Sequence, residues 1–302
     1  MRLGTKVLPI AVLAVLIAVN LVLLFLLFRP DQALTAQPAD QGPTSASPSA
    51  STGPTPSTRQ IEPAPVKRLL LATSSDTAWR TTVGDCDTAG EIERSNDGGA
   101  TWERIVRTGP APIVQLGTEP SGNVFAIGGT RQSCAYRYVA YANDGTAIAS
   151  TTRPVNVWFS TPKDRDEING PGDTKATPCE GHVVDLAPLD LSRALVVCDN
   201  GAVISTRNSG RTWRQIARIP NTLAIATEGD QYWVAGTQEG CDGVKVQSLT
   251  EKSGSLTRGR TRCAPSLDVT GGQVALDVTG DTIWLWSGNK VAVSMDEGQT
   301  WK

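Results

Sequence analysis

The sequence predicts an all-β domain built from repeated antiparallel hairpins, preceded by an N-terminal stretch of different composition. Three eight-residue segments have nearly the same sequence: SNDGGATW (95–102), TRNSGRTW (206–213) and SMDEGQTW (294–301). Each segment follows a short β-like run, and the first two lead into another such run, TWERIV and TWRQIA. A turn motif between two strand-like runs is typical of a β-hairpin, so we expect the same hairpin tip to recur along the chain.

The three segments share side chains that can close a turn without a ligand. An Asp or Asn side chain accepts hydrogen bonds from backbone N–H groups two residues further on. Gly adopts a positive φ without steric cost, and the Thr and Trp that follow suit the start of a strand. Each segment is therefore predicted to be a structural hairpin tip. The shared positions are Ser95, Asp97, Gly99, Thr101 and Trp102; Thr206, Asn208, Gly210, Thr212 and Trp213; and Ser294, Asp296, Gly298, Thr300 and Trp301.

The pattern S-x-D-x-G-x-T-W resembles the Asp-box of the bacterial neuraminidase repeat, which is found in sialidases, sortilin and photosystem II assembly factors. Two copies match the pattern fully, and the middle copy has Thr206 and Asn208 in place of Ser and Asp. The resemblance implies a β-propeller of four-stranded antiparallel blades. It implies no particular activity, because one fold serves many functions.

The spacing of the boxes predicts the number of blades, because a four-stranded blade takes about 40–50 residues. The boxes begin at 95, 206 and 294, so the second gap is two periods of 44 residues, with a lost copy near 250. The first gap holds a decayed copy at 141–147 and a surplus, 160–181, which we assign to a loop-rich insertion. This layout predicts five blades, or six or seven if irregular blades lie within 108–181. We expect 66–72 to add the outer strand of the last blade and close the ring.

The first 65 residues have the composition of a membrane anchor and a linker. Residues 7–28 carry no charge, and a helix of this length would be about 33 Å long, enough to span a bilayer. Arg2 and Lys6 precede it, so the positive-inside rule places 1–6 in the cytoplasm and the domain outside. A cleaved signal peptide is the alternative, although its apolar core is usually shorter. The Pro-, Ser- and Thr-rich residues 29–65 are predicted to be a disordered stalk, followed by the propeller at 66–302.

All six cysteines follow the apolar segment, and an even number outside the cytoplasm is typical of disulfides. Blade spacing favours pairing between near neighbours, as Cys86–Cys134, Cys179–Cys198 and Cys241–Cys263. No metal or other cofactor is expected, because no C-x-x-C spacing occurs and His182 is the only histidine. The arginines are scattered and the formal net charge is −2, so nucleic acid is not an expected partner.

The resemblance also makes glycoside hydrolysis a possibility to weigh. Sialidases bind the substrate carboxylate with three arginines and use a Tyr nucleophile supported by a Glu, with an Asp as the acid. Their first arginine lies in an Arg-Ile-Pro motif before the first box, whereas Arg218-Ile219-Pro220 here follows the middle box. The early strands, 66–90, offer only Lys67, Arg68 and Arg80, so no catalytic residue is assigned.

Other candidate residues have structural interpretations. Tyr136 and Tyr138 share one face of a predicted strand, which favours packing over catalysis. Residues 163–170 (KDRDEING) resemble a calcium loop, but Ile168 and Gly170 break the ligand pattern. His182 has no Ser or Cys partner that spacing identifies.

The sequence therefore favours a membrane-anchored, extracytoplasmic and non-catalytic propeller that recognises or scaffolds a protein or a cell-envelope glycan. A sialidase-type glycoside hydrolase and an assembly factor for a membrane complex are the alternatives. Because insertions on repeat folds commonly lie on the binding face, 160–181 is the expected binding surface.

Overall fold

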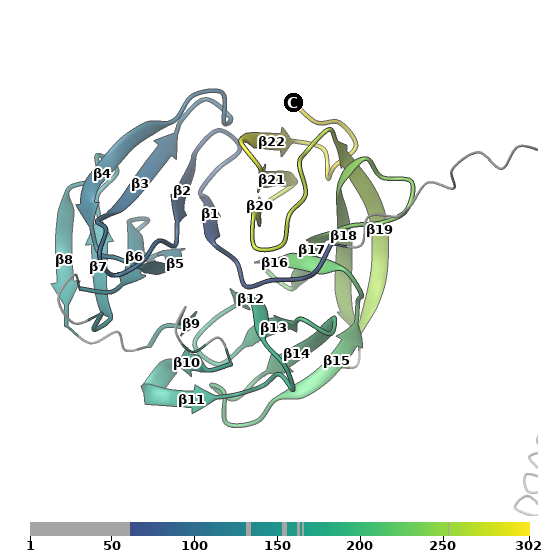
Figure 1. Ribbon diagram of the computed structural model, residues 1–302, viewed down its shortest axis with the longest axis horizontal. Coiled ribbons are helices and arrows are strands. Elements are labelled where there is room, and N and C mark those ends of the chain that lie inside the picture. Colours follow the sequence, from purple (N-terminus) through teal and green to yellow (C-terminus); the bar gives the residue numbers. More distant parts are fainter. Residues whose placement is uncertain (1–60, 131–133, 153–155, 162–163, 165, 253) are drawn as a thin grey trace, which may run out of the picture. The chain divides into compact units, whose positions relative to one another are not determined.

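The described domain is a ring of six antiparallel sheets (Figure 1). The computed structural model describes residues 61–130, 134–152, 156–161, 164, 166–252 and 254–302. The protein is thus a six-bladed β-propeller: the preferred count of five was wrong, and the alternative of six, with an irregular blade within 108–181, is confirmed. The predicted cytoplasmic residues 1–6, the predicted membrane helix 7–28 and most of the predicted stalk lie outside the described residues. Within the described residues, no helix is both long and apolar enough to span a membrane.

The first two blades have four strands each, and chain order runs from the axis outward. Adjacent strands pair antiparallel, as hairpins joined in sequence require. Blade 1 contains β1 (Arg68–Ala72), β2 (Ala78–Thr82), β3 (Gly90–Ser95) and β4 (Glu103–Gly109). Blade 2 contains β5 (Ile113–Thr118), β6 (Val124–Gly128), β7 (Arg137–Tyr141) and β8 (Ala147–Thr151).

Blade 3 is the irregular blade that the sequence allowed within 108–181 but that the preferred five-blade layout treated as an insertion. It consists of β9 (Phe159–Ser160), β10 (Ile168–Gly170), the 3-10 turn η1 (Pro171–Asp173) and β11 (Thr174–Ala176). Most of this blade lies inside 160–181, so this segment is not an insertion. Ile168 and Trp158 are buried and anchor the small sheet. Strands of two or three residues show no readable alternation, which explains why the pattern failed here.

The last three blades complete the ring. Blade 4 contains β12 (Val183–Pro188), β13 (Ala194–Cys198), β14 (Ala202–Thr206) and β15 (Arg214–Arg218). Blade 5 contains β16 (Thr222–Glu228), β17 (Gln231–Gly236), β18 (Gly243–Lys252) and β19 (Ser255–Pro265). Blade 6 contains β20 (Val274–Thr279), β21 (Thr282–Ser287) and β22 (Lys290–Ser294).

The position of β1 at the closure of the ring differs from the sequence-based expectation. Residues 66–72 were expected to add the outer strand of the last blade, but β1 is the inner strand of blade 1 and pairs with β2. Blade 6 begins a fourth strand only at Lys302, whose N–H and C=O both bond to Val293 at 3.0 and 2.9 Å. Among the described residues, blades 6 and 1 share no strand, and packing and hydrogen bonds between them join the two blades.

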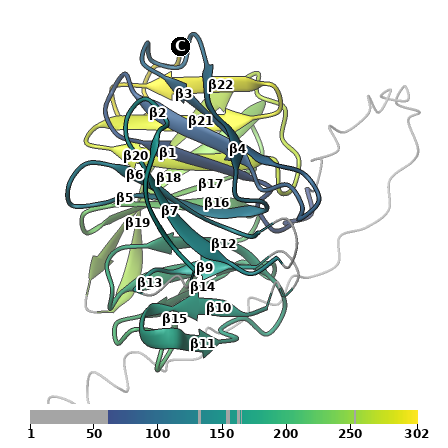
Figure 2. The same ribbon diagram turned by 90° about the vertical axis from the view of Figure 1, so that its left-hand side faces the viewer.

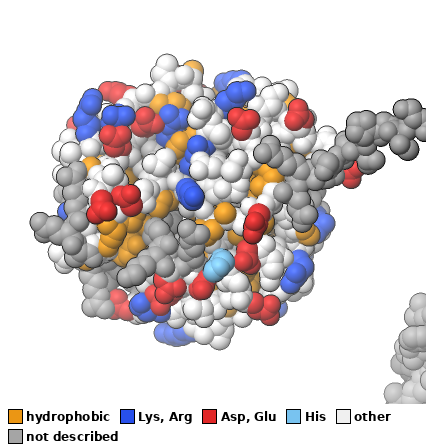
Figure 3. Space-filling view, in the orientation of Figure 1, with side chains coloured by type: hydrophobic (Ala, Val, Ile, Leu, Met, Phe, Trp, Pro, Cys, Tyr) orange, Lys and Arg blue, Asp and Glu red, His pale blue; other side chains and the backbone are white. Residues whose placement is uncertain are grey.

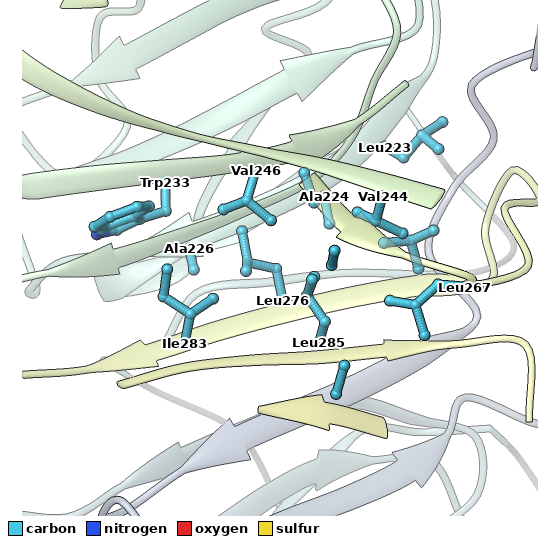
Figure 4. Packing of buried hydrophobic residues seen from close by; sticks show 14 of the residues in the cluster. Leu223, Ala224, Ala226, Trp233, Val244, Val246, Leu267, Leu276, Ile283 and Leu285 are labelled. Atoms are coloured by element: carbon cyan, nitrogen blue, oxygen red, sulfur yellow. The ribbon is translucent and has the colours of Figure 1, made fainter. Parts of the chain in front are cut away.

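Packing between neighbouring blades forms the core. In the cluster between blades 5 and 6, Trp233 and Val246 face Leu276 and Ile283 (Figure 4). At the seam of blades 6 and 1, the guanidinium of Arg80 lies 4.1 Å from the ring centroid of Trp102 and 4.9 Å from that of Trp286. This interleaving of cations and aromatic rings adds to the apolar contacts that close the ring.

Loops gather on two opposite faces of the ring (Figure 2). Three disulfides join Cys86 to Cys134, Cys179 to Cys198 and Cys241 to Cys263, the pairing favoured by the sequence. By strand connectivity all three lie on or next to the face that carries the β2–β3, β6–β7 and β17–β18 connections. We name this the disulfide face, and the opposite face, which carries the hairpin connections β5–β6, β12–β13 and β16–β17, the hairpin face.

Candidate functional site

The three repeated segments 95–102, 206–213 and 294–301, the boxes of the sequence analysis, are turns whose polar groups bond to one another. In the first box, the Ser95 hydroxyl donates to Asp97 Oδ1 at 2.8 Å and accepts from the N–H of Gly99 at 2.9 Å. The Asp97 carboxylate accepts from the Thr101 hydroxyl and N–H, and these bonds lower the pKa of Asp97 to about 2. The Trp102 indole N–H donates to the Gly99 carbonyl at 3.1 Å. No group in this turn requires a ligand.

The other two boxes repeat the bonds of the Ser and Asp side chains, but the indole bond recurs only in the middle box, where Trp213 donates to Gly210, and within the described part of the chain the Trp301 indole N–H has no partner. Thr206 takes the place of the serine, because its hydroxyl accepts from the N–H of Gly210 at 3.0 Å. Asn208 takes the place of the aspartate and bonds to both the N–H and the hydroxyl of Thr212 at 2.9 Å. In the third box, Ser294 and Asp296 reproduce the bonds of the first box.

Each box also touches the preceding blade. Gly99 has a φ of +87°, and a Cβ there would lie 3.1 Å from Cζ3 of Trp284 in blade 6. A Cβ on Gly210 would lie 3.3 Å from Trp158 beside blade 3. The box indoles add edge contacts, with centroids 6.4 Å apart for Trp102 and Trp284 and 5.9 Å apart for Trp213 and Trp158. The boxes therefore join neighbouring blades as well as closing hairpins.

The basic residues weighed for a sialidase-type site do not converge. Arg218 ends the outer strand β15, is exposed, and donates to the Asn200 carbonyl at 3.2 Å. Arg80 packs against Trp102, as described above. Lys67 and Arg68 lie near the axis, and only Arg68 of the residues named lines the large axial cavity.

The calcium-like segment, of which the structure describes 164 and 166–170, has Asp166 beside the single histidine. Ile168 and Gly170 belong to β10, and His182 Nδ1 lies 2.7 Å from Asp166 Oδ1 at the surface. No group of three or more metal-binding side chains occurs within the part of the chain that the structure describes. Figure 3 views the disulfide face, where acidic side chains lie beside His182.

The main concave feature is a cavity of about 910 Å³ on the ring axis. It is lined by the inner strands β1, β5, β12, β16 and β20 and by residues 156–158 ahead of β9. The walls are largely apolar, with Leu69, Leu71 and Leu116 among them. Its volume lies within the range of about 300–1,000 Å³ that is usual for ligand pockets.

Two aspartates of the cavity wall also bond adjacent blades together. Asp185 on β12 accepts from the N–H of Ile225 on β16 at 2.8 Å. Asp277 on β20 accepts from the N–H of Ala72 on β1 at 2.6 Å, across the seam that closes the ring. Burial raises the pKa of each carboxyl to about 7, against the effect of the backbone N–H donors, which lower it. The sequence analysis missed both residues, although a lone Asp within each apolar run, HVVDLAP and QVALDVT, was a usable signal.

A tyrosine–glutamate pair lies in the same cavity. The Tyr138 hydroxyl donates to Glu119 Oε1, and this bond lowers the pKa of Glu119. Burial and the neighbouring Glu119 raise the pKa of Tyr138. The Tyr138 ring stacks on Phe125 with centroids 5.1 Å apart, whereas Tyr136 packs against Phe159 at 5.4 Å. Tyr136 is therefore a packing residue, whereas Tyr138 presents its hydroxyl group at the cavity.

One end of the axial channel is covered by the chain as it enters the ring. The N–H of Val66 donates to the Val184 carbonyl at 2.9 Å, and the N–H of Lys67 donates to Gly272 at 2.8 Å. These bonds hold the segment across the disulfide face. On the hairpin face, the loops 119–123, 189–192 and 228–231 border the opposite end of the cavity.

Comparison with known proteins yields likeness in fold alone. No family model matches the chain, and no curated protein sequence matches it. Among solved structures, a functionally unknown protein from Desulfotomaculum acetoxidans has 12% identity over 81% of this chain and 89% of that one, with a TM-score of 0.47. The six-bladed lectin of Aleuria aurantia has 12% identity over 80% and 96%, with a TM-score of 0.47. YCF48 bound to D1 peptide has 15% identity over 82% and 87%, with a TM-score of 0.38.

Proposed function

We propose that this protein is a non-catalytic recognition or scaffolding module, held outside the cell membrane by residues 7–28, that binds a protein or cell-envelope glycan. The axial cavity is the observation that supports this proposal most strongly. It is large enough to take part of a partner, and it opens between loops contributed by several blades.

The chemistry of the cavity argues against catalysis. A general acid or base must reach the reacting proton in a substrate, but Asp185 and Asp277 are held by backbone N–H groups of the next blade. Shifted pKa values are often found at catalytic sites. Here the burial of Asp185 and Asp277 between neighbouring blades accounts for their raised pKa values.

A sialidase-type glycoside hydrolase is the second candidate, and the Tyr138–Glu119 pair in the cavity is the observation that favours it. Two features oppose this alternative. Arg68 is the only arginine among the described cavity-lining residues, whereas that chemistry needs three. The raised pKa of Tyr138 also disfavours the ionised form that a nucleophile uses.

Two measurements on the full-length protein in detergent distinguish these functions. We expect no turnover of a fluorogenic sialoside or of other aryl glycosides, and reproducible capture of a protein or retention on a glycan array. Turnover that Tyr138→Phe abolishes, with an unchanged melting temperature, would replace the recognition module by the hydrolase. Absence of both turnover and capture would contradict the proposal as well.

A further inference from the structure

We propose that the axial cavity takes a basic side chain of a protein partner, a Lys or Arg flanked by apolar residues, inserted from the hairpin face. This inference rests on the proposed recognition function and narrows it to a class of partner. Three observations support it: the shape of the cavity, the balance of charge on its wall, and the way its two ends differ.

The cavity wall combines apolar surface with polar and charged side chains. Leu69, Leu71 and Leu116 provide the aliphatic surface, and the stacked rings of Phe125 and Tyr138 provide an aromatic one. Lys and Arg side chains have an apolar stem that packs on such surface while the charged group seeks anionic partners.

The charge on the wall is predominantly negative. Five carboxyl groups line the cavity, against one described cation, Arg68. The Arg68 guanidinium already donates to the Gln273 and Gly288 carbonyls and lies 4.6 Å from the ring centroid of Trp286. Among the described residues, Asp190 is the one acid of the wall with a cationic partner, Arg193, at 2.6 Å. The five are Glu119, Asp185, Asp190, Glu228 and Asp277.

The remaining four acids bond to neutral groups. Glu228 accepts from the N–H of Gly280 at 2.8 Å, and Glu119 accepts from the hydroxyl of Tyr138. Asp185 and Asp277 accept from backbone N–H groups. Among the described residues, no Lys or Arg neutralises these four, so the cavity is electrostatically complementary to a cation.

The two ends of the cavity differ in access. Val66 and Lys67 bond across the disulfide face, so a ligand enters from the hairpin face. Leu191 lies at the cavity on this face and is 54% exposed, although it is a large apolar residue. An exposed leucine beside an acidic, apolar-walled cavity suits a partner segment in which apolar residues flank the basic one.

Proton linkage gives the proposal a distinct signature. The pKa of Asp277 is raised first by burial and then by the negative charges of Glu228 and Asp185, and the pKa of Asp185 is raised by burial. Glu119, Asp190 and Arg68 are the other charged groups on the wall. A bound cation stabilises the ionised carboxyls, so its affinity should increase as the pH rises from 6 to 8.

The test uses the full-length protein in detergent and three labelled peptides, Gly-Leu-X-Leu-Gly, with Arg, Gln or Glu at X. We expect saturable binding of the Arg peptide by fluorescence anisotropy, at least about tenfold weaker binding of the Gln peptide, and none of the Glu peptide. Binding of the Arg peptide should tighten from pH 6 to pH 8 and weaken with added salt.

Matched variants locate the site. Glu228→Gln and Glu119→Gln keep an acceptor for their neutral partners but lose the charge, so each should weaken Arg-peptide binding by about tenfold. Glu103→Gln is the control, because Glu103 is exposed on the outer strand β4. No saturable binding of the Arg peptide, equal binding of the Gln peptide, or unchanged affinity in both cavity variants would overturn the proposal. If a partner is captured while any of these results is obtained, the recognition function still holds and only the basic ligand is excluded.

Discussion

The hydroxyl of Ser95 offers a direct way to measure what one of the three boxes contributes to stability. Ser95 is 1% exposed, and its Oγ accepts from the Gly99 N–H at 2.9 Å and donates to Asp97 Oδ1 at 2.8 Å. Ser95→Ala removes this oxygen and leaves the Gly99 N–H without its acceptor in a partly buried turn. An unsatisfied donor of this kind costs about 1–2 kcal/mol. In a domain of this size, each kcal/mol lowers the melting temperature by about 2–4 °C.

Ser95→Thr is the matched control, because the middle box uses Thr206 for the same bond to Gly210 at 3.0 Å. We expect Ser95→Thr to retain most of the stability that Ser95→Ala loses, as measured by thermal unfolding followed by far-UV circular dichroism at constant pH. Equal melting temperatures for Ser95→Ala and the unchanged protein would refute the reasoning. Equal losses in both variants would show that packing around Ser95, and not its hydroxyl, sets the stability.

Three further predictions concern ring closure, backbone conformation and topology. Burial raises the pKa of Asp277 to about 7, above the value in an unfolded chain, so its contribution to stability is full below about pH 4 and is lost as the pH rises towards 7. Asp277→Asn keeps an acceptor for the Ala72 N–H, so between pH 5 and 8 the melting temperature of this variant should fall less than that of the unchanged protein. An equal fall in both proteins would contradict this role of Asp277. Gly99→Ala should cost about 1–3 kcal/mol in denaturant unfolding, because φ is +87° and the new Cβ would crowd Trp284; an unchanged midpoint would contradict it. Alkaline phosphatase fused after residue 65 should be active, and inactive fusions at normal expression would overturn the proposed topology.

The hairpin tips were predictable because their information is local. Each box encodes its own turn in eight residues, and the decayed copy at 141–147 and the lost copy near 250 both fall at connections between third and fourth strands, β7–β8 and β18–β19. The preferred count of five blades failed, and six remained only an alternative, because blade 3 has no box and very short strands. The prediction for β1 failed for another reason. The apolar run RLLLA suits an inner or an outer strand equally, so only its contacts with the rest of the ring decide which position it takes.

The candidate site was harder to predict because it is assembled from distant parts of the chain. The pairing of Asp277 with Ala72 joins residues 205 positions apart, and no local pattern encodes such a contact. The sequence does place a single acid inside each of two apolar strands, Asp185 and Asp277. A buried charge needs partners, so these positions signalled a special environment without showing that both face one cavity.

The central claim is that a partner binds at the axial cavity on the hairpin face. The most direct test places a photo-crosslinking amino acid at Leu191, beside the cavity, or at Ile148, on the exposed outer strand β8. Both side chains are exposed, so both variants should fold, and irradiation in the native membranes should yield a discrete protein adduct at position 191 and none at position 148. An adduct at 148 alone, or no adduct at 191 in a correctly folded protein, would contradict the account.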